Sequence, residues 1–136
     1  MNSRSDSDSV PDRPVELADA AALEAFVEEY SPALVEFVTD GCGVCASMEP
    51  VVGGVARGTD AAVGIVNPRD DPPLIDDYRI TSVPTLVLFV DGEERDRLAE
   101  GFVSGDRLTE FVAEAAERWR WCLIRSATPA RTVVSQ

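Results

Sequence analysis

An almost uninterrupted apolar segment, residues 33–38 (ALVEFV), places the strongest limit on how this chain can fold. Glu36 is its only charged residue, and such a run is typical of a central strand that is covered on both faces. Similar strand-like runs occupy residues 15–17, 61–66 and 85–90. Segments with helical spacing of apolar residues separate them. Strands that alternate with helices predict a mostly parallel sheet with helices on both faces.

Helix-start signals support this alternation. Asp19 and Ser104 each precede a segment whose apolar residues recur at three- and four-residue intervals, so both are expected to be N-caps. Another helix is expected to begin near Cys42, directly after the turn that ends the 33–38 strand, and a short one spans residues 74–78. The expected order is therefore βαβαβα, a hairpin and a closing helix.

A two-residue turn signal, Asp91-Gly92, follows the strand at 85–90 and predicts a β-hairpin. Its partner strand is expected at residues 95–100. Because hairpin strands are antiparallel, they extend the parallel core at one edge. We therefore expect an α/β fold with a central mixed β-sheet flanked by helices on both faces.

The length of 136 residues fits one domain. We expect this domain at residues 15–123, between a disordered acidic and serine-rich leader (1–14) and a flexible C-terminal tail (124–136). The leader lacks the apolar core of a secretory signal, and no apolar run approaches the roughly 20 residues of a membrane-spanning helix. A soluble cytoplasmic protein with no membrane partner is the default expectation.

Acidic residues dominate the charge of the chain. It has 25 Asp and Glu residues against 12 basic residues, all of them arginine, and its net charge is −13. Such a surface disfavours nucleic acid as a partner, since phosphate binding requires clusters of Lys and Arg. Two interpretations remain: an acidic surface that docks a partner, and a halophilic protein kept soluble in concentrated salt. We favour the second, because the acidic residues are spread along the chain rather than gathered in one block.

The chain contains no histidine, which excludes Ser-His-Asp and Cys-His nucleophiles and His-ligated metal sites. Its three cysteines, Cys42, Cys45 and Cys122, cannot complete a four-cysteine zinc site within one chain. A zinc site shared between two chains is the only metal alternative, and we expect no metal. The chemistry must then come from thiols, carboxylates or the backbone.

Cys42 and Cys45 lie where the buried strand passes into a helix. Unpaired N–H groups at a helix start stabilise a thiolate, so the pKa of Cys42 is expected to fall below that of a free thiol. Two intervening residues bring the second sulfur within disulfide reach, and the pair can exchange disulfides with a substrate. By exposure, Cys42 is expected to be the nucleophile and Cys45 the buried resolving thiol. A bare CxxC also forms half of a zinc site, but the strand–helix context favours redox chemistry.

Three segments carry a resemblance to a known family. LVEFVTDGCGVC, with Pro50 five residues after Cys45, TSVPTLVLFVDGE and GFVSGDRLTEFV resemble thioredoxins. The resemblance implies the thioredoxin fold and a thiol–disulfide oxidoreductase without a prosthetic group, in the first place a protein-disulfide reductase. It also implies disulfide-containing protein substrates and a reductase or other electron donor. We expect the chain to act as a monomer.

The active-site motif departs from the usual family sequence. Gly41-Cys42-Gly43-Val44-Cys45 stands where most thioredoxins carry Trp-Cys-Gly-Pro-Cys. Gly41 removes a covering indole and Val44 replaces a proline that stiffens the loop, which leaves the redox potential and the partner specificity open. An oxidase- or isomerase-type variant and a non-catalytic binding or adaptor module are therefore alternatives. Gly41, Gly43 and Val44 are candidate substrate-contact residues.

Glu36 has two interpretations. On an exposed strand it is an ordinary solvent-facing carboxylate, whereas in a sheet covered on both faces it is a buried base that takes the proton from Cys45. Burial would raise its pKa toward neutrality, which suits that task. We favour the buried base, and thioredoxins carry a buried Asp at the matching position.

Pro84 lies in the segment TSVPT, directly before the strand at 85–90. By base rate alone it would be a trans proline that starts a strand. The resemblance to the cis-proline loop of the family implies a cis Val83–Pro84 bond instead. Such a bond would turn the Val83 backbone toward the dithiol, where it can pair with an extended substrate segment.

Cys122 is expected to lie on the apolar stripe of the last helix, three residues after Trp119. A cysteine at such a position is usually a small hydrophobic core residue, and we favour that reading. A regulatory or intermolecular thiol is the alternative.

Overall fold

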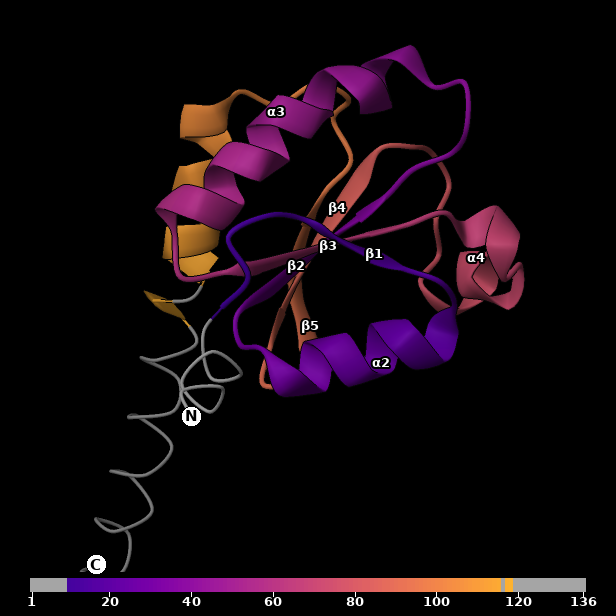
Figure 1. The fold of residues 1–136 in the computed structure, drawn as a ribbon, viewed down its shortest axis with the longest axis horizontal. Coiled ribbons are helices and arrows are strands. Elements are labelled where there is room, and N and C mark those ends of the chain that lie inside the picture. The colour runs from indigo at the N-terminus through magenta and orange to yellow at the C-terminus, as the bar shows by residue number, and fades with distance from the viewer. Residues whose placement is uncertain (1–9, 116, 119–136) are drawn as a thin grey trace, which may run out of the picture.

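The sheet has five strands in the order β1-β3-β2-β4-β5 (Figure 1). They are β1 (Val15–Leu17), β2 (Ala33–Phe37), β3 (Ala62–Val66), β4 (Thr85–Val90) and β5 (Glu93–Leu98). β1, β3 and β2 are parallel, whereas β4 runs antiparallel to β2 and β5 antiparallel to β4. This computed structural model describes residues 10–115 and 117–118. The predicted mixed sheet with an antiparallel pair at one edge is confirmed.

Helices connect the parallel strands and close the fold. They are α2 (Ala20–Glu29), α3 (Gly43–Gly58), the 3-10 turn η1 (Pro68–Asp70), α4 (Pro73–Asp77) and a C-terminal helix that starts at residue 105. The Asp19 carboxylate accepts a hydrogen bond from the N–H of Ala22 at 2.9 Å, and the Ser104 hydroxyl accepts one from the N–H of Arg107 at 3.2 Å. Both predicted N-caps are thus confirmed.

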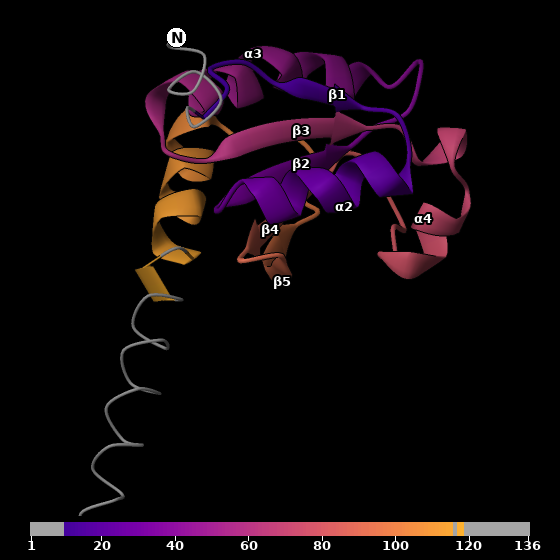
Figure 2. The ribbon, with the colours of Figure 1, turned by 60° about the horizontal axis from the view of Figure 1, so that its bottom comes forward.

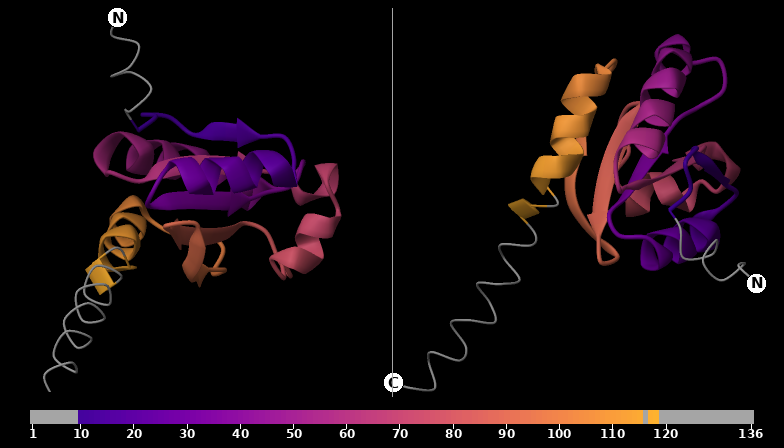
Figure 3. Two further views of the ribbon diagram at one scale, coloured as in Figure 1. Left: turned by 90° about the horizontal axis from the view of Figure 1, so that it is seen from below. Right: turned by 60° about the vertical axis from the view of Figure 1, so that its left-hand side comes forward.

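Helices cover both faces of the sheet. Met48 of α3 and Leu108 of the C-terminal helix belong to one buried cluster, and Phe26 of α2 and Leu74 of α4 belong to another. In Figure 1 α3 and α2 flank the strands on opposite sides, and Figures 2 and 3 show the C-terminal helix and α4 at opposite ends of the molecule. β2 and β4 are buried along their whole lengths, which explains why their sequences are almost continuously apolar.

The hairpin differs from the prediction in the bounds of its second strand. Asp91 and Gly92 alone form the turn, with φ angles of 55° and 81°. Such a two-residue turn pairs Val90 directly with Glu93, so β5 spans Glu93–Leu98 and not residues 95–100. The prediction was wrong by two residues because the charged stretch that opens β5 carries no apolar signal.

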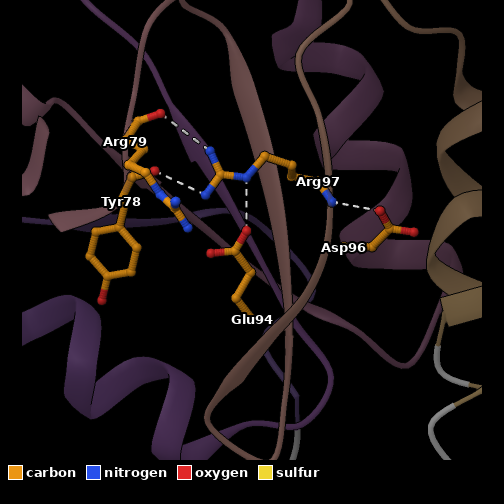
Figure 4. Close-up of polar contacts among 5 residues, drawn as sticks. All are labelled: Tyr78, Arg79, Glu94, Asp96 and Arg97. Carbon is orange, nitrogen blue, oxygen red and sulfur yellow. Dashed lines mark hydrogen bonds and ion pairs between the residues drawn. The ribbon is translucent and has the colours of Figure 1, made fainter. Parts of the chain in front are cut away.

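One arginine ties α4 to the edge strand β5 (Figure 4). Arg97 donates from Nη2 to the carbonyl oxygen of Tyr78 at 2.9 Å and from Nη1 to that of Arg79 at 3.3 Å. Its Nε donates to the Glu94 carboxylate at 2.8 Å. Because Tyr78 and Arg79 directly follow α4, the guanidinium satisfies carbonyl groups at a helix end. This contact anchors the chain just ahead of the loop that contains Pro84.

Candidate active site

The two cysteines of the CxxC motif lie at the start of α3 and form a disulfide, with their Cα atoms 5.2 Å apart. The chain leaves β2 at Phe37 and turns at Gly41, whose φ of 77° lies in the left-handed region that favours glycine. Cys42 is the N-cap residue of α3. The local sequence therefore places the first sulfur at the helix N-terminus, as predicted.

The surroundings of the two sulfurs differ. Cys42 is half-buried, whereas Cys45 is only 6% exposed. The N–H of Cys45 donates to Sγ of Cys42 at 3.1 Å, and the N–H of Ala46 donates to the carbonyl oxygen of Cys42 at 3.1 Å. A negative charge on the Cys42 sulfur would thus be stabilised by a backbone donor and by the helix N-terminus.

Glu36 is buried in the middle of β2, with 1% of its surface exposed. Its neighbours across the sheet are Ile65 on β3 and Leu86 on β4. Its Oε2 atom has no hydrogen-bond partner among the residues that the structure describes. Burial in these apolar surroundings, and secondarily the charge of Glu49, raises the pKa of Glu36 to about 7. The solvent-facing interpretation of Glu36 is therefore wrong.

A pocket of about 520 Å³ joins Glu36 to the disulfide. Its lining includes Glu36, Cys42, Cys45 and Glu49, together with the loop residues between β2 and α3. The carboxyl group and the buried sulfur thus open onto the same space. Such an arrangement can pass a proton between them, directly or through one water molecule.

Glu49 is a site residue that the sequence analysis missed. It follows Cys45 by four residues on α3, so the two residues lie on one helical face. This spacing was a usable signal. Its consequence for the pKa of Glu36 depends on how α3 packs on β2, which the sequence does not specify.

The loop before β4 carries Pro84, and the Val83–Pro84 peptide bond is cis. Thr85 of β4 is paired with Phe37, the last residue of β2. Pro84 therefore precedes β4 at the sheet end from which the chain continues toward Cys42. The Thr85 hydroxyl donates to the carbonyl oxygen of Ser82 at 2.7 Å, which fixes the loop beside the proline.

The other candidate contact residues lie on the surface around the disulfide. Gly41 and Gly43 are exposed and Val44 is 42% exposed. The structure therefore brings these residues together with Cys42, while their contact with a substrate stays a prediction. Cys122 lies outside the described residues, as do most of the predicted leader and the predicted tail.

Two features are absent from the described part of the chain. No group of three or more Cys, Asp and Glu side chains there is placed to hold a metal ion. No helix among residues 10–115 and 117–118 is long and apolar enough to cross a membrane.

A family model described as thioredoxin matches residues 14–114. The chain belongs to the thioredoxin family. It has the thioredoxin fold, and it is a thiol–disulfide oxidoreductase of the protein-disulfide reductase type that acts on disulfide substrates. The predicted family, fold and general activity are thus confirmed.

Curated thioredoxins are similar to this chain over most of their own length. That of Porphyra purpurea is 32% identical over 83 residues, which cover 60% of this chain and 78% of the relative. That of Mycobacterium bovis is 30% identical over 94 residues, which cover 68% and 81%.

Solved thioredoxin structures are similar to this fold. A mutant thioredoxin from Halobacterium salinarum has a TM-score of 0.75 and 32% identity, covering 79% of this chain and 95% of that chain. The thioredoxin of Schistosoma mansoni, at 19% identity and a TM-score of 0.69, shares the fold and covers 78% of this chain and 98% of that chain.

Proposed function

We propose that Cys42 is the nucleophile of this protein-disulfide reductase and that Cys45 resolves the mixed disulfide. The greater exposure of Cys42 and its position at the start of α3 support this assignment. A substrate can reach Cys42 from solvent, whereas the 6% exposure of Cys45 restricts that sulfur to an internal reaction.

The reaction is a thiol–disulfide exchange in two steps. In each step one S–S bond forms and one S–S bond breaks, so no external oxidant or reductant is needed. The Cys42 thiolate attacks one sulfur of the substrate disulfide, a mixed disulfide forms, and the other substrate sulfur leaves as a thiolate that takes up a proton. The Cys45 thiolate then attacks Sγ of Cys42, and the second substrate thiolate leaves. Two electrons have passed from the dithiol to the substrate, and the Cys42–Cys45 disulfide remains.

Glu36 is the proposed base that takes the proton from Cys45 in the second step. The observation that carries this role is the pocket shared by Glu36 and both cysteines. A carboxyl group whose pKa is about 7 can accept a proton near neutral pH and later return it to solvent. The nearby charge of Glu49 contributes to this value, after burial.

Substrate binding is assigned to the surface around the disulfide. The proposed contacts are the Val83 backbone beside Pro84 and the exposed positions Gly41, Gly43 and Val44. An extended substrate segment would pair with the Val83 backbone while its disulfide faces Cys42.

The cellular setting is also a proposal. We propose a cytoplasmic monomer that receives electrons from a reductase or other donor and serves electron transport and cell redox homeostasis. Cell fractionation tests the cytoplasmic location, and sedimentation tests the monomeric state. The domain at 15–123 with its leader and tail is likewise proposed, and limited proteolysis tests those bounds.

A halophilic origin is proposed from the net charge of −13, and the similar thioredoxin from Halobacterium salinarum supports it. Screening of acidic repulsion should then raise the free energy of unfolding steadily from low salt to the molar range. Equal stability at low ionic strength would favour the alternative of an acidic docking surface.

Insulin reduction with dithiothreitol as electron donor tests the proposed function. We expect catalytic turnover that is lost in Cys42→Ser. Absence of acceleration by the wild-type protein would support the adaptor alternative. A redox potential measured against glutathione would separate a reductase from an oxidase or isomerase.

A further inference from the structure

Two adjoining pockets beside the disulfide are lined by carboxylates. The first, of about 520 Å³, contains Glu16, Glu36, Asp40 and Glu49. The second, of about 240 Å³, shares Glu16 and Asp40 with it and adds Asp70. No arginine is found in the described lining of either pocket.

These five carboxylates form no ion pair within the described part of the chain. The ion pairs there join other residues, namely Arg13 to Asp12, Arg95 to Glu93, Arg97 to Glu94, Arg107 to Glu100 and Arg118 to Asp96. Four of these five pairs neutralise carboxylates on β5 or just before the C-terminal helix. The negative charge around the disulfide is left unpaired.

Glu36 supplies an independent observation. Its side chain is almost fully buried, it lines the larger pocket, and its Oε2 atom has no hydrogen-bond partner among the described residues. Buried carboxylate oxygens are normally satisfied by a donor. The apolar walls at Val38 and Ile65, which line both pockets, reduce the local dielectric and concentrate the negative field where a substrate arrives.

We propose that this reductase prefers disulfide substrates that carry lysine or arginine beside the reacting cysteine. The proposal rests on the function assigned above to Cys42. A cationic side chain next to the substrate disulfide would enter the acidic pockets while Cys42 attacks. An acidic side chain at the same position would be repelled.

Matched peptide disulfides test this preference. The peptides differ only in the residues that flank the cysteine, which are lysine, serine or glutamate, and kcat/KM is measured for each. The assay uses the lowest salt concentration at which the circular dichroism spectrum is native. We expect the lysine peptide to react about tenfold faster than the glutamate peptide, with the serine peptide between them, and the difference to shrink in molar salt.

A pair of double variants separates the local charge from the total charge. Glu16→Gln/Asp40→Asn removes two exposed pocket carboxylates, and Glu28→Gln/Glu110→Gln removes two exposed carboxylates outside both pockets. We expect the first to lose most of the preference and the second to keep it. Equal loss in both would contradict the proposal, because the total charge would then be responsible.

Competition for a trapped intermediate gives a second readout. Cys45→Ser should accumulate a mixed disulfide at Cys42, and mass spectrometry of an equimolar peptide mixture should show the lysine peptide in excess. Reaction with all peptides in equal amounts would overturn the preference and leave the proposed function intact. If no peptide reacts, both the substrate preference and the proposed function are overturned.

Discussion

Two regions of this protein differ in how their charges are paired. Along β5, arginines and carboxylates form ion pairs, and Arg97 also holds the end of α4 through two carbonyl groups. Beside the disulfide, carboxylates gather around a pocket with no ion pair among the described residues, and Glu36 is buried without a hydrogen bond to Oε2.

The difference separates charges that bridge elements of the fold from carboxylates that are left unpaired beside the disulfide. A guanidinium that bridges two elements stabilises the structure, although exposed ion pairs add only about 0–1 kcal/mol each. A buried unpaired carboxyl group costs stability when it ionises, and such groups occur where a reaction uses them. The following variants test this division, beginning with the largest expected effect.

Replacement of either cysteine should abolish catalytic turnover of a protein disulfide. The two variants differ in what accumulates: Cys45→Ser should retain a covalent mixed disulfide at Cys42, whereas Cys42→Ser should retain none. Cys122→Ser is the matched control and should turn over normally. Mass spectrometry under non-reducing conditions distinguishes them, and trapping through Cys45 in Cys42→Ser would reverse the assignment.

Glu36→Gln should slow resolution of the mixed disulfide by about a hundredfold, because Cys45 loses its proposed base. Stopped-flow measurement of the second step isolates this effect from the first attack. Glu28→Gln, at an exposed position on α2, removes the same charge and should leave the rate unchanged. Equal rates in wild type and Glu36→Gln would remove Glu36 from the mechanism.

The contribution of Glu36 to the free energy of unfolding should fall as pH rises from about 4.5 to about 7. Burial raises the pKa of Glu36 to about 7 in the folded state, so the native protein binds more protons than the unfolded chain in this window. Below the unfolded pKa both states are protonated, and above pH 7 both are ionised. The stability that Glu36→Gln gains relative to wild type should therefore increase by about 3 kcal/mol across the window. Denaturant unfolding at several pH values measures it, and a constant difference would contradict the raised pKa.

Arg97→Gln should lower the free energy of unfolding by about 2 kcal/mol, because it removes charge-assisted hydrogen bonds to two carbonyl groups. Arg107→Gln is the control, since it removes one exposed ion pair with Glu100 and should cost less than about 1 kcal/mol. Amide exchange should also quicken at Ile80, just after α4, whose N–H donates to the carbonyl oxygen of Ile75 within that helix. If Arg97→Gln and Arg107→Gln lower the free energy of unfolding equally, the contact between Arg97 and the end of α4 does not stabilise the fold.

The sequence predicted the parts of this structure that local signals encode. Apolar runs located the central strands, Asp19 and Ser104 marked helix starts, and the spacing of Cys42 and Cys45 located the redox site. Each of these signals lies within a few residues of the feature it predicts.

The parts that were missed depend on packing between distant elements. β5 begins at Glu93 with charged residues. Its start therefore lacks the alternation of apolar and polar residues that predicts a strand. Arg97 meets the end of α4 across 18 and 19 positions of sequence, and Glu49 affects Glu36 only because α3 packs on β2. A single sequence does not specify which side chains such packing brings together.

Titration of the Glu36 carboxyl group tests the central claim, that a buried acid in the pocket beside the disulfide can accept a proton near neutral pH. Carbon-13 NMR of the labelled side chain, assigned by its loss in Glu36→Gln, gives the pKa in the folded disulfide form. We predict a pKa of about 7. A value near the ordinary glutamate pKa of about 4.5 would contradict the account, since Glu36 would then be almost fully ionised near neutral pH and too weak a base to take the proton from Cys45.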